Sequence, residues 1–437
     1  MHCSALTRAL WLAWVVSAQP PPPSANATVP APGPTGTSPA PAPVPTEPPS
    51  NGSASLEVFT ISANNITASF IPYGARLTSL LVPDRSGQQQ DIVVGFDDPA
   101  QYVANAASNN AYIGPVVGRY ANRIKNSTFV LDGVTYHIPS NEFNKTQTVH
   151  GGVVGYDQRN WIVTDYTTNS ITFALFDRGF ENFPGDVINL ATYTVNSSWS
   201  ANNSDFQTQL TTRTVSIALT ARTPIMLANH IYWNLNAFKE PNILNNTYLQ
   251  LPLSSRYIPT DSHLIPTGQI GDVKTALNGT LDFTSPKLVG QDIRSASVCG
   301  NNCTGYDTCF IIDRPSNRSD WTSSPETMIQ ALNMTSTTTG ISMVVHTNQK
   351  AVQIYSCNTQ NGTLPVKPSQ VQRNNQQNAG NMTHPVDTVQ QYGCLVIEPE
   401  GWIDGINNPQ WGQLPYQVFG PASAPAVNWA TYVFGTV

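Results

Sequence analysis

Short runs of β-branched and aromatic residues, separated by turn residues, continue from about residue 55 to the end of the chain, and they constrain the fold most. Such runs predict strands at residues 56–61, 68–71, 128–131, 134–138, 171–176, 215–219, 341–345 and 352–355. Asp132-Gly133 joins the third and fourth runs, a pattern typical of a two-residue hairpin turn. No repeat of about 20 to 50 residues is present in the sequence, which disfavours a propeller or a solenoid.

Helical periodicity is sparse in the same region. Residues 98–102 predict one short helix, with Pro99 at its first position. No second linker rich in Pro and Ser divides residues 55–437. We therefore predict a single all-β domain over this range, built as a large antiparallel β-sandwich.

The N-terminus has the pattern of a secretory signal over residues 1–18. Arg8 precedes an apolar stretch, and the small residues Ser17 and Ala18 follow where a signal peptidase would cleave. Residues 19–54 are rich in Pro, Ala, Ser and Thr, which predicts a disordered linker that cannot form a core. Asn-x-Ser/Thr sequons, such as those at Asn65 and Asn196, agree with a secreted glycoprotein.

Charged residues make up only 11% of the chain, and the formal net charge is −6. The usual charged fraction of a soluble protein is about 25%. Without a basic excess the chain is not expected to bind nucleic acid or an anionic membrane surface. No apolar run in the sequence reaches the roughly 18–20 residues that a membrane-spanning helix requires. The sequence therefore predicts neither nucleic acid nor membrane as a partner.

The cysteines predict disulfides and no metal site. Cys299 and Cys303 flank a turn that is short enough for a disulfide to close. Once Cys3 is removed with the signal, an odd number remains, so at least one thiol is unpaired or pairs between chains; the others are Cys309, Cys357 and Cys394. No His lies at metal-ligand spacing from these residues. The sequence also has no phosphate-binding glycine loop, so we predict no metal and no cofactor.

Ionisable and aromatic side chains gather in five clusters, at residues 118–124, 150–152, 229–235, 306–307 and 393–402. The first has Asn122 beside Arg123, whose donors suit sugar hydroxyls. The second places His150 before two glycines, where the backbone can approach a ligand closely. The third surrounds His230 with aromatic side chains that could stack on a pyranose. Each cluster taken alone also has a structural alternative, such as a buried His whose hydrogen bonds are satisfied or a turn Asp.

The fifth cluster ends an apolar strand at Glu398, and the two-residue period of a strand would point Glu400 to the same face. Paired carboxyl groups suggest acid–base chemistry, and each can raise the pKa of the other. Two carboxyl groups at i and i+2 of one strand would lie roughly 6–7 Å apart along one wall. A glycoside hydrolase instead places its carboxyl groups on opposite sides of the scissile bond.

In this order, the motifs resemble those of the aldose 1-epimerases (galactose mutarotases), from about residue 56 to residue 437. The motifs that carry the resemblance are GRYANRI at 118–124, His150-Gly151-Gly152, Phe183-Pro184-Gly185, Asn229-His230, Pro266-Thr267-Gly268, Tyr306-Asp307 and Glu398-Pro399. The resemblance implies a galactose mutarotase-like β-sandwich with a sugar-binding cleft on one face.

The resemblance also implies an isomerase that interconverts the α and β anomers of hexoses such as glucose and galactose. Glu398 would act as the general base on the anomeric hydroxyl, and His230 as the general acid on the ring oxygen. Residues implied to bind the sugar are His150, Asn122, Arg123, Asp307 and Gln353.

The chain departs from the family pattern at Glu400, where Gln is usual, and at residues 363–386, which read as a polar insertion. Two alternatives stay open. A secreted glycoside hydrolase or lyase would use Glu398 and Glu400, and a non-catalytic protein would only bind carbohydrate.

Overall fold

The computed structural model describes residues 54–108, 111–199, 206–301, 303–315, 328–377 and 386–437. The predicted signal sequence and nearly all of the predicted linker lie outside the described residues. Strands dominate the described part of the chain, which has two α-helices, α1 (Ala100–Ser108) and α2 (Pro368–Gln377). Neither helix is long and apolar enough to cross a membrane.

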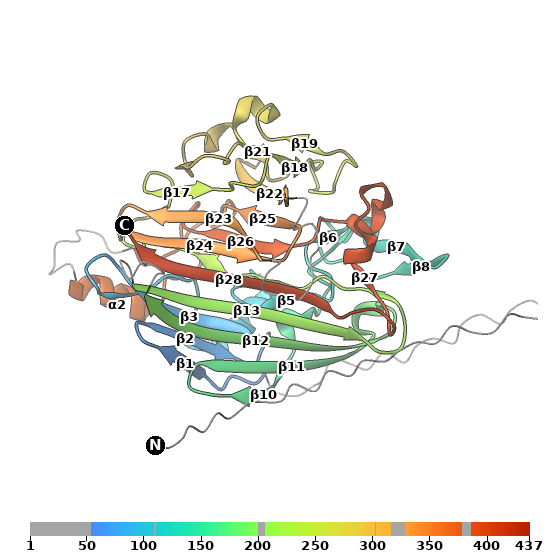
Figure 1. Cartoon of the computed structure of the whole chain (residues 1–437), viewed down its shortest axis with the longest axis horizontal. Helices are drawn as coiled ribbons and strands as arrows, with labels where there is room; N and C mark the ends of the chain where they lie inside the picture. Colours follow the sequence, from blue (N-terminus) through green and yellow to red (C-terminus); the bar gives the residue numbers. More distant parts are fainter. Residues whose placement is uncertain (1–53, 109–110, 200–205, 302, 316–327, 378–385) are drawn as a thin grey trace, which may run out of the picture. The chain divides into compact units, whose positions relative to one another are not determined.

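The largest sheet has nine strands, and all its neighbouring strands run antiparallel, with the long strand β28 in the middle (Figure 1). In spatial order the strands are β10 (Ile162–Tyr166), β11 (Ser170–Arg178), β12 (Asp186–Trp199), β13 (Phe206–Ala218), β28 (Ala426–Thr436), β24 (Ile341–Thr347), β23 (Ile329–Ser336), β17 (Thr247–Gln250) and β20 (Lys287–Leu288).

A second sheet carries the residues that matter most for function. Its order is β16 (Tyr232–Trp233), β26 (Leu395–Glu400), β25 (Ala351–Tyr355), β22 (Gly305–Ile311), β18 (Arg256–Ile258) and β19 (Gly271–Asp272), and β21 (Ser297–Val298) pairs with β22 in parallel. A four-stranded sheet has the order β1 (Phe59–Ala63), β2 (Ile66–Ile71), β3 (Arg76–Pro83) and β4 (Gln89–Asp91).

The remaining strands form short antiparallel pairs. They are β5 (Val116–Val117) with β15 (Ala228–Asn229), β6 (Arg123–Ile124) with β9 (Thr148–Val149), β7 (Thr128–Leu131) with β8 (Val134–His137), and β14 (Thr223–Pro224) with β27 (Val418–Phe419).

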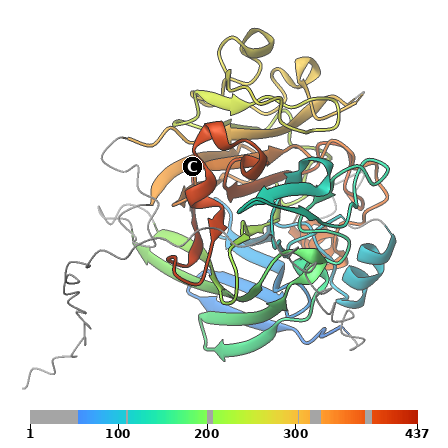
Figure 2. The ribbon, with the colours of Figure 1, turned by 90° about the vertical axis from the view of Figure 1, so that its right-hand side faces the viewer.

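One hydrophobic core joins the three larger sheets, which confirms the predicted antiparallel β-sandwich. Ile354 of β25 and Ile397 of β26 pack in this core with Tyr432 of β28 and Phe70 of β2. In Figure 2 the blue and green strands lie on one side of the body and the yellow strands on the other. Because side chains alternate along a strand, the neighbours of Ile354 and Ile397 point to the opposite face of their sheet.

The hairpin prediction is confirmed in detail. Strands β7 and β8 pair with Leu131 opposite Val134, so only Asp132 and Gly133 form the turn. Both turn residues have positive φ, 53° and 78°, as a type I′ turn requires.

All the predicted strands overlap observed ones. The prediction at residues 215–219 covers only the C-terminal end of β13, which begins at Phe206, and the first predicted strand starts too early. We predicted that strand from residue 56, but β1 begins at Phe59. The segment before it is held differently, because the Ser55 carbonyl accepts a hydrogen bond from Tyr73 N–H and Ser55 N–H donates to Asn160 Oδ1.

The two helices differ more from expectation. Helix α1 spans Ala100–Ser108 and so continues past the predicted end at residue 102. Asp98 Oδ1 accepts a hydrogen bond from Ala100 N–H, the N-cap arrangement that goes with Pro99 at the first position. Helix α2 lies within the segment that we predicted as a polar insertion. Its buried side chains are the amides Gln370 and Asn374, and Gln370 Nε2 donates to Asp91 O and Val93 O. Hydrophobic periodicity therefore gave no signal for α2.

The described cysteines form two disulfides, Cys299–Cys303 and Cys357–Cys394. The first is the pair that the sequence suggested. Cys309 is the free thiol that the odd number of cysteines required, and it is buried.

Candidate active site

A cavity of about 680 Å³ lies on the face of the second sheet that points away from the hydrophobic core. The structure places every sequence-predicted site residue in its lining: Asn122, Arg123, His150, His230, Asp307, Gln353 and Glu398.

One wall of the cavity consists of three neighbouring strands. Glu398 of β26 lies beside Gln353 of β25, and Asp307 of β22 lies beside Tyr355 of β25. These four side chains share one face, and the Asp307–Tyr355 row lies roughly 6–7 Å from the Glu398–Gln353 row. Gln353 Nε2 donates to Asp307 Oδ1 over 2.5 Å, which links the two rows.

A facing wall comes from the strand pair β6 and β9, which brings Asn122 and His150 together. Asn122 N–H donates to His150 Nδ1 over 3.2 Å, so a neutral His150 ring carries its hydrogen on Nε2. Both residues have left-handed backbone conformations, with φ of 57° and 51°.

The glycine after His150 has a different role from the one we expected. Gly151 has φ of 89°, and a Cβ there would lie 2.1 Å from Gly118 O. The position therefore excludes a side chain because the backbone of Gly118 passes close by. This close contact with Gly118 is enough to explain the glycine, without an approach of the backbone to a ligand.

Arg119 and Arg123, the two arginines of the 118–124 motif, have different roles. Arg119 is buried and forms an ion pair with Asp177, with Nη2 and Oδ1 2.5 Å apart, which anchors the motif in the fold. Arg123 instead faces the cavity. Its Nε and Nη2 donate to the two carboxylate oxygens of Glu142, each over 2.8 Å, and Nη2 lies 3.6 Å from Asp307 Oδ2. Burial opposes the charge, but Glu142 and Asp307 hold the pKa of Arg123 above its ordinary value.

His230 lies between β15 and β16, and its Nε2 is 3.7 Å from Glu398 Oε1. The His150 ring lies 5.0 Å from the His230 ring, and the Tyr112 ring lies 5.8 Å away. Burial lowers the pKa of His230 to about 3. Burial also lowers the pKa of His150 well below its usual value, and a positive charge on His230 would lower the pKa of His150 further. Both imidazoles are therefore neutral at neutral pH.

Glu398 is only 3% exposed. Burial raises its pKa well above the usual value, and the neighbouring carboxyl of Glu400 raises it further. Glu398 Oε2 and Gln353 Oε1 have no hydrogen-bond partner within the described part of the chain. An acceptor buried without a partner is unfavourable, so these two oxygens are suited to receive hydroxyl groups from a ligand.

Glu400 follows Glu398 and Pro399 at the end of β26 and is completely buried. Asn122 Nδ2 donates to Glu400 Oε1 over 2.7 Å, and burial raises the pKa of Glu400 to about 8. Glu400 is not part of the cavity lining. It therefore cannot face Glu398 across a glycosidic bond, which removes the basis for the hydrolase alternative.

His150, His230 and Glu398 also form a group whose potential metal-binding atoms all lie within 4.8 Å of one another. Two imidazoles and a carboxylate can bind zinc, but only through unprotonated nitrogens. Since Asn122 N–H occupies Nδ1 of His150, the remaining nitrogen of the neutral ring carries hydrogen. The arrangement suits a donor to a ligand oxygen better than a metal ligand.

Two residues that shape the site carry no sequence motif, and one aromatic residue lies elsewhere than we predicted. Tyr112 packs edge-on against His150, with ring centroids 4.6 Å apart, and Glu142 positions Arg123. Neither belongs to a motif, and no local pattern marks them. Of the aromatics beside His230, Tyr232 lines the cavity, but Trp233 is fully buried against Tyr432 and cannot stack on a sugar.

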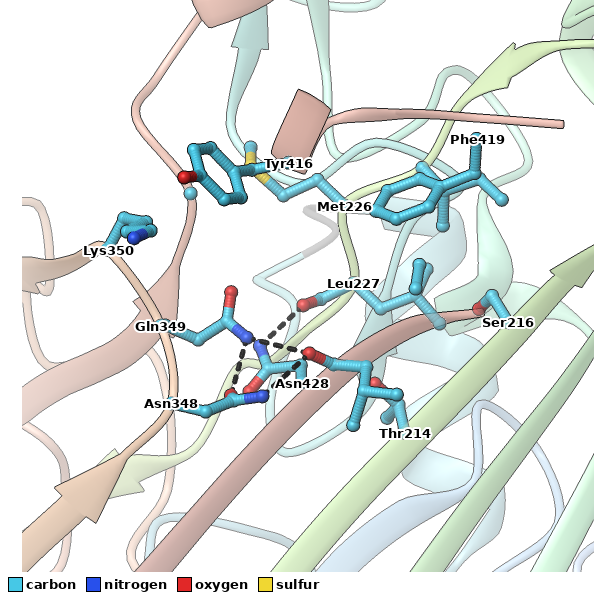
Figure 3. A pocket seen from close by; sticks show the side chains of 14 residues that line it. Thr214, Ser216, Met226, Leu227, Asn348, Gln349, Lys350, Tyr416, Phe419 and Asn428 are labelled. Atoms are coloured by element: carbon cyan, nitrogen blue, oxygen red, sulfur yellow. Dashed lines mark hydrogen bonds between the residues drawn. The ribbon is translucent and has the colours of Figure 1, made fainter. Parts of the chain in front are cut away.

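A smaller cavity of about 30 Å³, between β13, β28 and the segment at Asn348, has room for about one water molecule (Figure 3). Its amides already bond within the protein: Asn428 Nδ2 donates to Leu227 O, and Asn348 Nδ2 donates to Val427 O. We therefore assign this cavity a structural role.

The fold and the large cavity define a β-sandwich protein with a buried carboxyl–imidazole site. Comparisons with known proteins identify its family. The family model described as aldose 1-epimerase matches residues 57–416. A probable aldose 1-epimerase of Arthroderma benhamiae is 65% identical over 390 residues, which cover 89% of this chain and 88% of the relative. The galactose mutarotase of Sus scrofa is 30% identical over 364 residues, which cover 83% of this chain and 90% of that protein.

Among solved structures, an aldose epimerase homologue from C. elegans superimposes with a TM-score of 0.68 at 25% identity, over 87% of this chain and 99% of the other. The galactose 1-epimerase of Lactobacillus acidophilus shares the fold, with a TM-score of 0.62 at 19% identity, over 86% and 94% of the two chains. The chain belongs to the aldose 1-epimerase family, whose members are isomerases.

The raised pKa of Glu400 predicts how stability changes with pH. A buried acid with a folded-state pKa of about 8 and a reference value of 4.5 binds its proton more tightly when folded. Its contribution to stability is therefore full below about pH 4.5 and is lost as the pH rises toward 8. Glu400→Gln keeps the acceptor for Asn122 and removes this titration. The free energy of unfolding of the variant, relative to wild type, should rise by roughly 3 kcal/mol between about pH 5 and pH 7.5.

Urea unfolding at several pH values measures this difference. Glu57→Gln, at an exposed position, is the matched control and should follow the wild type. A constant difference between Glu400→Gln and wild type across the pH range would contradict the assignment.

Proposed function

We propose that the protein is an aldose 1-epimerase that interconverts the α and β anomers of hexoses such as glucose and galactose. The observation that carries the proposal is the approach of Glu398 to His230, 3.7 Å apart, within a cavity rich in hydroxyl-binding groups. Opening a hemiacetal requires one proton to leave the anomeric hydroxyl while another reaches the ring oxygen. The named activities of the relatives in Arthroderma benhamiae and Sus scrofa support the same reaction.

The resting site holds the proton that this reaction needs. Burial raises the pKa of Glu398 and lowers that of His230, so the proton lies on Glu398 and the imidazole is neutral. Moving this proton to His230 gives a carboxylate and an imidazolium with no change in the total proton count. Glu398 then takes the proton from O1 as His230 gives its proton to the ring oxygen.

Ring opening returns the site to its resting protonation, with the proton on Glu398 and neutral His230. The open aldehyde rotates about its C1–C2 bond and recloses on either face, which reverses both proton transfers. No covalent intermediate with the protein is formed in these reaction steps.

The other lining residues hold the sugar, and Glu400 behind the lining affects the charge of Glu398. Arg123 and Asp307 present a fixed donor and acceptor, and Gln353 Oε1 accepts a further hydroxyl. His150 donates through Nε2 to the ring oxygen. Burial raises the pKa of Glu400 to about 8, and once Glu400 ionises its charge opposes the ionised form of Glu398 and raises the pKa of Glu398 further.

The proposal predicts loss of catalysis in two conservative variants. Freshly dissolved α-D-glucose and α-D-galactose should relax faster with the protein than without it. General acid–base catalysis contributes about 10²–10⁴-fold, so Glu398→Gln and His230→Asn should each lower the enzymatic rate constant by that order. Polarimetry measures the relaxation, and Glu57→Gln serves as the control.

No acceleration with any common aldose would refute the proposal. Release of new reducing ends from a polysaccharide would support a hydrolase instead.

We also propose that the protein is exported, since two disulfides are typical of oxidising compartments. Cleavage after Ala18 predicts that protein recovered from the medium begins at Gln19. N-terminal sequencing tests this, and a mature chain that retains Arg8 would contradict it.

A further inference from the structure

A second cavity, of about 350 Å³, lies at the other end of the sheet that carries the active site. Lys350, which immediately precedes β25, lines this cavity, whereas Tyr355 at the far end of β25 lines the active-site cavity. Among the described residues, none lines both cavities. Ligand sites usually measure about 300–1,000 Å³, so the second cavity has room for a small molecule of its own.

Positive charge gathers in this cavity, although the whole chain has a net charge of −6. Arg256, Arg314 and Lys350 line it, three of the chain's 21 Lys and Arg residues. Asp313 is the only acidic residue in the described lining, so three positive charges and one negative charge leave a net +2. The Asp313 carboxylate is already bonded, because Arg256 Nε and Ser255 Oγ donate to it over 2.8 Å and 2.6 Å. We call this space the basic cavity.

Two of the cations are fixed by the fold. Arg314 Nη2 donates to Thr347 O over 2.8 Å and to Gln349 O over 2.9 Å. Burial lowers the pKa of Arg314 to about 10, so the guanidinium is charged at neutral pH and a negative charge nearby would be favourable. Lys350 Nζ lies 4.3 Å from the centroid of the Tyr416 ring (Figure 3). Guanidinium and ammonium groups form strong charge-assisted hydrogen bonds with carboxylates and phosphates.

The rest of the lining suits a ligand with hydroxyl groups and an apolar face. Gln413 is only 8% exposed, and its Nε2 donates to Trp411 O over 3.0 Å. Gln413 Oε1 has no hydrogen-bond partner within the described part of the chain. A buried acceptor of this kind is unfavourable unless a donor such as a hydroxyl reaches it. The ring of Trp402 lines the same cavity and offers the kind of surface on which a pyranose packs.

We propose that the basic cavity binds a monosaccharide that carries an anionic group, either a carboxylate or a phosphate. The anionic group lies at Arg314 and Lys350, one hydroxyl donates to Gln413 Oε1, and the sugar ring packs on Trp402. The inference goes beyond the proposed function and does not depend on it, because neither Glu398 nor His230 lines the basic cavity.

Isothermal titration calorimetry on the full-length protein tests the proposal with D-glucuronate and glucose 6-phosphate. Inorganic phosphate is the matched probe without a sugar ring. We expect at least one of the two anionic sugars to bind at least tenfold more tightly than inorganic phosphate. The sugar that binds more tightly shows whether the site takes a carboxylate or a phosphate.

Substitutions localise the binding to the basic cavity. Lys350→Gln removes one charge and should raise Kd for the preferred sugar about tenfold, as loss of a charge-assisted hydrogen bond would. Gln413→Leu removes the hydroxyl acceptor and should raise Kd about threefold or more. Arg294→Gln, at an exposed position outside both cavities, is the matched charge control and should leave Kd unchanged. Glu398→Gln should also leave Kd unchanged, because Glu398 lies in the other cavity.

Three outcomes would overturn the proposal. The first is that neither anionic sugar binds, or that Lys350→Gln binds it as tightly as wild type. The second is that inorganic phosphate binds as tightly as both sugars, which would make the cavity a site for simple anions. The third is that Glu398→Gln weakens binding while Lys350→Gln does not, which would place the sugar in the active-site cavity. None of these outcomes bears on the epimerase proposal, which polarimetry tests separately.

Discussion

Removing carboxyl and imidazole groups from water is the constraint on which the active site depends. Glu398, Glu400 and His230 are all nearly or fully buried. In such surroundings the neutral form of each group is favoured, so carboxyl pKa values rise and imidazole pKa values fall. In the mechanism we propose, this same shift leaves one transferable proton between Glu398 and His230, which is what ring opening and reclosure require.

The sandwich supplies the rigidity that such an arrangement requires. Alternation along β26 sends Ile397 into the hydrophobic core and Glu398 into the cavity, so the acid–base wall cannot move without disturbing the packing behind it. The Arg119–Asp177 ion pair fixes the segment that carries Asn122 in the same way. Charge is scarce in the whole chain, and the charges that remain in the cavity form a connected set around Arg123.

Local chemistry made parts of the fold predictable, and long-range packing made other parts unpredictable. Asp132 and Gly133 specify their hairpin because both residues adopt the positive φ that a type I′ turn requires. Short runs of β-branched and aromatic residues indicated the strands. Helix α2 was missed because Gln370 binds backbone carbonyls more than 270 residues away in sequence, which no window can detect. The site residues were found through ordered motifs, whereas Glu142 acts only through Arg123 and carries no motif of its own.

The protonation of the buried carboxyl groups at neutral pH is the central claim of this account, and infrared difference spectroscopy measures it directly. Wild type minus Glu400→Gln, and wild type minus Glu398→Gln, should each show the loss of one carbonyl stretching band of a protonated carboxylic acid. Bands of ionised carboxylates in both difference spectra, with no protonated carbonyl band, would contradict the account.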